Sequence, residues 1–250
     1  GSLDFARSVE ELQTVIEARL SEMDAFASTM ALHRLARLSH DVDGSTQDSR
    51  STRSTSSSSS RPWLSQREQR ACRDRLAGAV KRHPSWPQLL ARLGASEALA
   101  CAEPRQLANM SWALARLKAL DALPLLRAAA LRCGRREGPG LWDPMSISLI
   151  PWSFATMGLQ ELHTTTEVRE MTRSISEAIR EEGSSNWPPG DLSRVLWSWA
   201  KLLQKDDTFF RRSSCMITSR IGEYSPSQLA QTIWAFATVA PADACAHFFP

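Results

Sequence analysis

The sequence predicts an all-α fold, an α-solenoid of stacked helix–turn–helix repeats of about 37–45 residues. One twelve-residue pattern occurs four times: Pro, two residues, Leu or Ile, a small residue, three residues, Trp, a small residue, a large apolar residue and Ala. The copies are PRQLANMSWALA from Pro104, PMSISLIPWSFA from Pro144, PGDLSRVLWSWA from Pro189 and PSQLAQTIWAFA from Pro226. The composition agrees, because a single Tyr and few β-branched runs argue against a large sheet.

The spacing of the copies sets the repeat unit. The motif tryptophans stand at positions 112, 152, 197 and 234, so successive copies are 40, 45 and 37 residues apart. A second helix is predicted after the Trp motifs, over 123–133, 166–182 and 207–221. In a repeat of this kind, each unit hides its apolar face only against its neighbours.

The N-terminal part divides into a helical pair and a linker. Residues 1–40 predict two helices, over 8–20 and 24–38, and ALHRLARL at the end of the second aligns with the repeat end, with His33 in place of Trp. We interpret this helix as a degenerate fifth copy. Residues 41–62 are polar and Ser-rich, which predicts a disordered linker; a phosphorylated Ser tract is the alternative. The helical repeat array is expected over 63–250, with an Arg-rich helix at 62–83 and a short helical connection at 84–101 that breaks near Gly94.

Helix ends follow from Pro and Gly. Pro is tolerated in the first turn of a helix, where its missing N–H is not needed, so each motif Pro predicts a helix start. Helix C-termini are expected at five glycines: Gly134, Gly138, Gly140, Gly183 and Gly222.

A helical wheel around each motif Trp leaves one narrow polar stripe. With Trp as position zero and ~100° per residue, positions −7, −3 and +4 fall at ~20–60°, and nearly all the rest of the circumference is apolar or small. Helical repeats that read single-stranded RNA direct a few variable polar side chains per repeat at each base. We therefore predict RNA contacts from the stripe; the alternative is the solvent-exposed edge of an inert scaffold. The candidates are Asn109, Arg116, Thr156, Arg194, Lys201, Gln231 and Thr238. The motif tryptophans themselves are predicted to be core pillars, that is, large side chains buried between the helices of the repeat.

The net charge of +3 conceals a basic middle. Residues 61–136 hold 15 Lys and Arg against 5 Asp and Glu, whereas both flanking parts are mildly acidic. This indicates either a polyanion contact or arginines that decorate solvated helix faces. On the first interpretation, the phosphate-binding candidates are Arg67, Arg70, Arg73, Arg127, Arg132, Arg135 and Arg136.

Nothing in the sequence points to an enzyme. It has no GxGxxG, GxxxxGK[ST], HExxH or GxSxG motif, and its five Cys have no CxxC spacing, so we expect no catalytic residue, metal site, cofactor or small-molecule substrate. No run approaches 18 apolar residues, so no membrane span is expected. Residues 166–182 read as a solvated helix whose Glu and Arg pair along the helix.

The repeats resemble a known family. LANMSWALARL, LIPWSFATMGL, LSRVLWSWAKL and LAQTIWAFATV, with ALHRLARL, resemble the octotricopeptide-like repeats found beside RAP domains in algal, dinoflagellate and apicomplexan organelle proteins. The likeness covers about residues 22–40 and 100–240. Two features depart from the family: the spacing is looser than its near-constant period, and no RAP-like segment follows.

The resemblance implies an RNA-binding protein of a mitochondrion or chloroplast that acts in RNA processing, stability or translation. The partner would be single-stranded RNA or rRNA. The alternative is a structural subunit of a large organellar protein assembly, such as a ribosome. Because the chain begins at Gly1 rather than Met, we expect that a targeting peptide is not present in it.

Overall fold

The computed structural model describes residues 2–40, 65–138, 140–181, 187–241 and 244. Over these residues the chain forms twelve α-helices, joined by short loops and 3-10 turns, and no strand. The all-α prediction is therefore confirmed. The predicted linker at 41–62 and the helix end at Gly183 lie outside the described residues.

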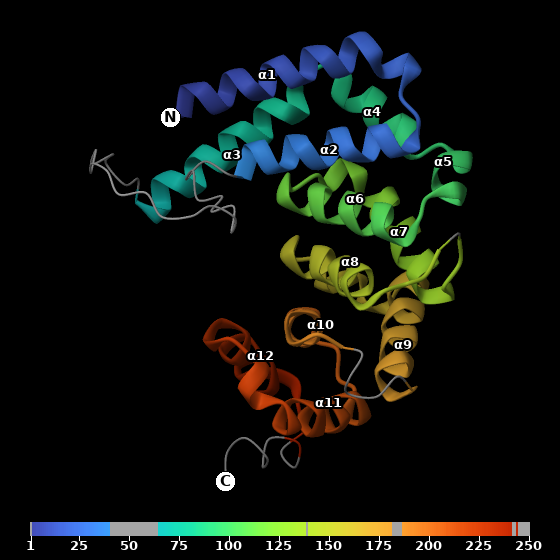
Figure 1. Ribbon diagram of the computed structural model, residues 1–250, viewed down its shortest axis with the longest axis vertical. Helices are drawn as coiled ribbons and strands as arrows, with labels where there is room; N and C mark the ends of the chain where they lie inside the picture. Colours follow the sequence, from blue (N-terminus) through green and yellow to red (C-terminus); the bar gives the residue numbers. More distant parts are fainter. Residues whose placement is uncertain (1, 41–64, 139, 182–186, 242–243, 245–250) are drawn as a thin grey trace, which may run out of the picture.

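The motif helices form one continuous row (Figure 1). Each of the four Pro–Trp patterns is one helix, and each helix packs against the next in chain order. The helix that holds ALHRLARL packs against the first of them, so the degenerate copy occupies the place of a fifth repeat helix. The row consists of α2 (Ala25–His40), α6 (Pro104–Arg116), α8 (Pro144–Thr156), α10 (Pro189–Lys201) and α12 (Pro226–Val239).

A second row lies along one side of the first, in which α7 packs on α9 and α9 on α11 (Figure 1). It consists of α7 (Leu123–Arg135), α9 (Thr166–Glu181) and α11 (Asp207–Ser219), with 3-10 turns η2 (Leu120–Ala122), η3 (Gln160–Thr164) and η5 (Ile221–Glu223) in the connections. These helices agree with the predicted ranges to within two residues.

The N-terminal end of the motif row is covered by other helices. α2 contacts α1, α3 and α4, and α5 leads into α6. Their bounds are α1 (Ser2–Arg19), η1 (Leu20–Glu22), α3 (Gln66–Arg82), α4 (Ser85–Leu93) and α5 (Ser96–Cys101). Gly94 is the C-cap of α4, which confirms the predicted break.

The residue before the motif Pro caps its helix in several copies. Asp143 accepts a hydrogen bond from the Ser146 N–H at 2.7 Å. Ser225 and Gln228 form a capping box, in which the Ser225 hydroxyl accepts from the Gln228 N–H and the Gln228 side chain accepts from the Ser225 N–H. Such caps satisfy N–H groups that the first turn leaves without partners, so they fix where the helix begins.

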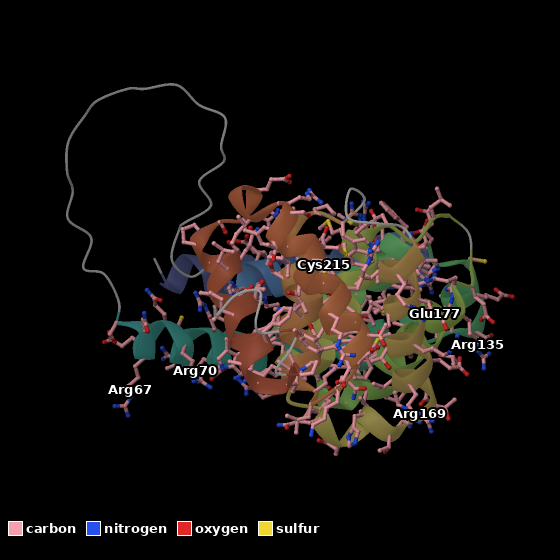
Figure 2. The ribbon with its side chains drawn as sticks, turned by 90° about the horizontal axis from the view of Figure 1, so that it is seen from below. Arg67, Arg70, Arg135, Arg169, Glu177 and Cys215 are labelled. Atoms are coloured by element: carbon pink, nitrogen blue, oxygen red, sulfur yellow. The ribbon has the colours of Figure 1, made fainter. Side chains whose placement is uncertain are left out.

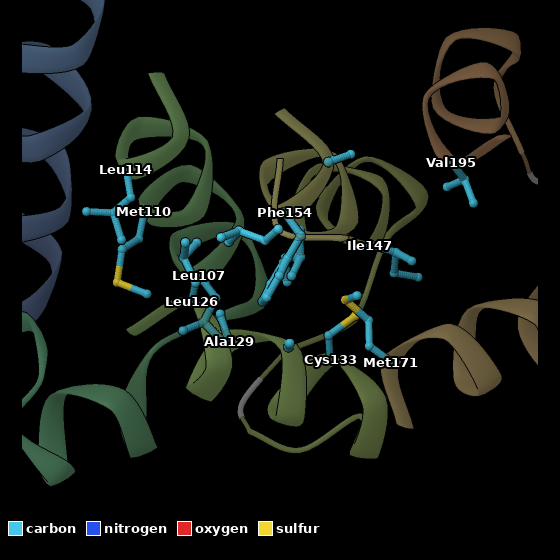
Figure 3. Packing of buried hydrophobic residues seen from close by; sticks show 14 of the residues in the cluster. Leu107, Met110, Leu114, Leu126, Ala129, Cys133, Ile147, Phe154, Met171 and Val195 are labelled. Carbon is cyan, nitrogen blue, oxygen red and sulfur yellow. The ribbon is translucent and has the colours of Figure 1, made fainter. Parts of the chain in front are cut away.

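The core pillars stand two residues after the motif Trp. Leu114, Phe154, Trp199 and Phe236 occupy this position, and each is at most 1% exposed. Figure 3 shows Phe154 among the buried side chains of neighbouring helices, beside Leu107 and others. The motif tryptophans, which were predicted to fill the core, are not its fully buried members: Trp112 and Trp197 are partly buried and pack against the core, and Trp234 is 41% exposed. Both positions are large and apolar, and only the position of the second row decides which of them is buried.

Aromatic rings tie the two rows together at the C-terminal end. The Trp199 ring lies 5.3 Å from Phe209, Phe209 lies 5.2 Å from Phe210, and Phe210 lies 5.2 Å from Phe236. The last two pairs meet edge to face, an arrangement that aromatic quadrupoles favour. These contacts join α10, α11 and α12 through one buried cluster.

Three motif helices end with a left-handed residue six positions after Trp. Lys118, Gly158 and Leu203 have φ values of 50°, 72° and 54°. The next N–H donates to a carbonyl one turn back, as in a Schellman motif: Ala119 to Leu114 at 3.0 Å, Leu159 to Phe154 at 3.1 Å and Gln204 to Trp199 at 2.9 Å. The sequence gives little sign of these ends, because two of the three residues are not glycine.

Of the described glycines at which helix ends were predicted, one lies inside a helix and the others lie outside the α-helices. Gly134 lies inside α7, where an added Cβ would stand 2.7 Å from the Met171 nitrogen of α9. Its role is thus to let α7 and α9 approach closely. Gly138 and Gly140 follow the helix with φ values of 108° and 83°, and Gly222 lies in η5.

We expect Gly158→Ala to lower the free energy of unfolding by about 1 kcal/mol, because alanine disfavours a left-handed backbone. A Cβ at Gly158 would meet nothing within 4 Å, so the loss would be conformational rather than steric. Leu203→Gly, at an equivalent position with a side chain 57% exposed, should raise stability instead. Urea denaturation of both variants measures the two changes in the free energy of unfolding. Changes of the same sign would contradict this account.

Candidate nucleic-acid interface

The motif tryptophans lie on the side of the row that faces away from the pillars. Position zero is ~200° around the helix from position +2, so burial of the pillars turns Trp outward. Trp112, Trp152 and Trp197 are partly buried, and Trp234 is 41% exposed. In α2, the His33 ring lies 4.9 Å from the Trp112 ring and so continues the series. Burial, aided by the charge of Arg37, lowers the pKa of His33, which favours a neutral ring.

Cations from position +4 lie between successive tryptophans. The Arg116 guanidinium is 5.4 Å from the centroid of the Trp112 ring and 4.9 Å from that of Trp152. The Lys201 ammonium is 5.8 Å from Trp197 and 5.5 Å from Trp234. Each cation therefore bridges two adjacent helices by cation–π contacts. We call the whole set the aromatic row: His33, Trp112, Arg116, Trp152, Trp197, Lys201 and Trp234.

The other two copies have a threonine at position +4. Thr156 and Thr238 are both exposed, and the Thr238 hydroxyl donates to the Trp234 carbonyl at 2.7 Å. Charged and uncharged side chains therefore alternate along the row.

The residues at position −3 of the predicted stripe do not join the aromatic row. Arg194 Nη1 donates to the Ser148 hydroxyl of α8 and to the Asp191 carboxylate, both at 2.6 Å, which ties α10 to the preceding helix. Asn109 is partly buried, and Gln231 is exposed on α12. The predicted stripe thus divides, because position +4 joins the aromatic row, whereas Arg194 is used in the contact between helices.

A basic pocket of about 480 Å³ opens at the C-terminal ends of α2, α6 and α8, with α3 as one wall. It brings together residues that the sequence analysis assigned to two different sets: Arg70 and Arg73 as phosphate ligands, and Arg116 and Thr156 as stripe residues. The remaining lining residues are His40, Gln66, Gln69, Asp74, Ala115 and Lys118. Arg116 belongs both to this basic pocket and to the aromatic row.

Hydrogen bonds to His40 position two of the pocket's arginines. Arg116 Nη1 lies 2.8 Å from His40 Nε2, and Arg73 Nε donates to the His40 carbonyl at 3.1 Å. On the same side, Lys118 Nζ pairs with Asp74 at 2.8 Å. His40 and Lys118 were not among the predicted site residues, because they join the pocket only through the position of α3.

Four other predicted phosphate ligands lie elsewhere, on α7 and at its C-cap. Arg127 pairs with Glu167 at 2.7 Å and Arg135 with Glu170 at 3.0 Å, both on α9. The Arg136 Nε donates to the Ser174 hydroxyl of α9 at 2.9 Å. Figure 2 shows Arg135 on the opposite side of the molecule from Arg67 and Arg70. The predicted phosphate ligands therefore do not share one surface. The pairing predicted along residues 166–182 occurs between Arg173 and Glu177 at 2.9 Å, whereas Glu167 and Glu170 pair with α7 instead.

Arg132, the fourth of these, is a structural residue. It is 9% exposed and donates to the carbonyls of Leu99, Ala102 and Glu137, so it fastens α7 to the segment that leads into α6. Burial lowers its pKa, while the charge of Glu137 opposes that shift.

Within the described residues, no group of three or more His, Cys, Asp and Glu side chains is placed to hold a metal ion. Nor does any described helix combine the length and apolar character that a bilayer crossing needs.

Burial raises the pKa of the Cys133 thiol to about 12, so this thiol stays protonated at neutral pH. No protein-family model matches the chain, and no curated protein is significantly similar to it.

We expect Arg132→Met to lower the free energy of unfolding by about 2–3 kcal/mol, because it removes charged hydrogen bonds and leaves buried carbonyls without a donor. Arg135→Met is the matched control, since its exposed ion pair should contribute about 0–1 kcal/mol. Chemical denaturation gives both values. Equal losses would show that Arg132 does not have this role.

Proposed function

We propose that this protein binds single-stranded RNA along the aromatic row. The observation that supports the proposal is a series of partly exposed tryptophans on successive helices, in which Arg116 bridges Trp112 to Trp152 and Lys201 bridges Trp197 to Trp234. An indole face offers a stacking surface for any base, and a guanidinium plane offers another. Arg116 and Lys201 would also neutralise phosphates, so binding would weaken with salt.

The repeat geometry suits one nucleotide per unit. Neighbouring packed helices are typically about 8–10 Å apart, and helical-repeat readers of RNA use about one base per repeat. A strand that runs along the row would meet a tryptophan at each helix and a cation or a threonine at the next step. The resemblance to octotricopeptide-like repeats supports the same proposal and adds the organellar setting, with roles in RNA processing, stability or translation.

A double charge reversal tests the electrostatic part of this proposal. We expect Arg116→Glu with Lys201→Glu to reduce affinity for a single-stranded RNA by at least about 100-fold and to lower the salt slope by about 1.4, since each single-strand phosphate contact contributes about 0.7. Fluorescence anisotropy at several salt concentrations measures both.

The matched control for this test is Arg169→Glu with Arg212→Glu, exposed residues of α9 and α11 that change the net charge equally. Both proteins should retain their helical circular dichroism. If the control loses as much affinity as the test variant, binding responds to net charge and not to the aromatic row.

A second prediction concerns stacking. Trp234→Ala should weaken RNA binding by about tenfold, because base–aromatic stacking contributes about 1–3 kcal/mol per base. Its effect on stability should be small, since Trp234 is 41% exposed. Phe236→Ala on the same helix, at a pillar, should instead cost about 3–5 kcal/mol of stability. RNA titrations and thermal unfolding of both variants separate the two roles; unchanged affinity in Trp234→Ala would argue against stacking there.

A second candidate function is a structural subunit that binds protein, and one observation favours it. Positions −4, −1 and +3 are buried in α6, α8 and α10, but their counterparts Ala230, Ile233 and Ala237 in α12 are exposed. Such an apolar helix face suits another helix. Purification of the protein with its partners, with and without ribonuclease, discriminates the two functions. Partners lost after nuclease treatment favour RNA, and partners retained favour a protein assembly.

A further inference from the structure

We infer that the basic pocket binds the terminal phosphate monoester of an RNA whose bases lie on the aromatic row. This inference rests on the proposed function and extends it from the bases to one end of the strand. The pocket and the row meet at Arg116, which lines the pocket and also bridges Trp112 and Trp152. A nucleotide on those rings would therefore bring its phosphate to the mouth of the pocket.

The charge of the pocket fits a dianion. Among the described residues, its lining holds four cations, Arg70, Arg73, Arg116 and Lys118, and one carboxylate, Asp74, which pairs with Lys118. A phosphate monoester carries about −1.5 to −2 charges at neutral pH, whereas an internal phosphodiester carries about −1. The excess of cations over carboxylates in the described part of the lining is thus better matched by a chain end than by the interior of a strand.

Two of the cations come from different helices but contact the same residue. Arg73 of α3 and Arg116 of α6 are both anchored on His40, one through its backbone carbonyl and the other through its ring. Because these contacts already order the two guanidinium side chains, an anion that binds there costs less side-chain entropy. Guanidinium groups also match phosphate oxygens with paired N–H donors, and Thr156 and Gln69 supply neutral hydrogen-bonding groups in the same lining.

The pocket occurs once, whereas the aromatic row repeats. Among the described residues, α3 forms one wall of this pocket, and its main helix contacts are with α1, α2 and α4 at the N-terminal end of the motif row. A repeated surface suits the parts of RNA that repeat, its bases and internal phosphates. A single basic pocket at one end of that surface suits a group that occurs once at a given end of the strand.

The experiment compares one RNA oligonucleotide with hydroxyl ends, with a 5′-phosphate and with a 3′-phosphate. We expect a phosphate at one of the two ends to tighten binding to the unaltered protein by about tenfold or more. The variant Arg70→Gln with Arg73→Gln should lose this preference while it still binds the hydroxyl-ended RNA within about threefold of the unaltered protein. Arg70→Gln alone, at an exposed position, should weaken the preference and guards against a folding defect in the double variant.

The matched control is Arg67→Gln with Arg75→Gln, which removes two charges from exposed residues of the same helix outside the pocket lining. It should keep the preference for the phosphorylated end. Indifference to a phosphate at both ends, or a preference that survives in the double variant at Arg70 and Arg73, overturns this inference and leaves the proposed function standing. Failure of every oligonucleotide to bind overturns both.

Discussion

The close approach of successive motif helices is the constraint on which the rest of the structure depends. The small residues at position −4, Ala108, Ser148 and Ser193, are completely buried. Two of them also bond to the next helix, as Ser148 and Asp191 lie 3.2 Å apart, and Ser193 accepts from Thr232 at 3.2 Å. A larger side chain here would push the helices apart, because protein interiors have little spare volume. Arg116 and Lys201 could then no longer reach the tryptophan of the following helix.

This contact also explains why one helix can hold two large apolar side chains, at positions zero and +2, that differ in burial. The residue at +2 fills the space between the rows, as Phe154 and Trp199 do at 0% exposure. The Trp at position zero is then free to show part of its ring while its edge packs on the neighbouring helix. Trp112 and Trp197 still pack against the core, but on α12 Trp234 is 41% exposed and Phe236 only 1%, so the two positions of that helix can be tested separately.

The sequence predicts much of this fold because its information is local and repeated. The four patterns fix the motif helices, Pro marks each start, and ALHRLARL is sufficient to place α2 in the row. Two misjudged features are set by contacts distant in sequence. Whether Trp152 or Phe154 is buried depends on where the second row lies. The basic pocket requires α3 to lie near the turn that follows α6, where Lys81 donates to the Lys118 carbonyl. The left-handed backbone of Leu203 could not be predicted for another reason, because a tight turn sets it and no glycine marks it.

The arrangement of charged side chains makes one side of the molecule more positive than the other. The basic middle of the chain divides between the two rows. On α7, Arg127 and Arg135 are matched by Glu167 and Glu170 of α9, and such exposed pairs add little stability but cancel their charge locally. On the motif row and α3, the described residues that line the basic pocket include four cations and one carboxylate. A polyanion that approaches the molecule would therefore be drawn toward the side that bears the outward-facing tryptophans, where stacking can retain it.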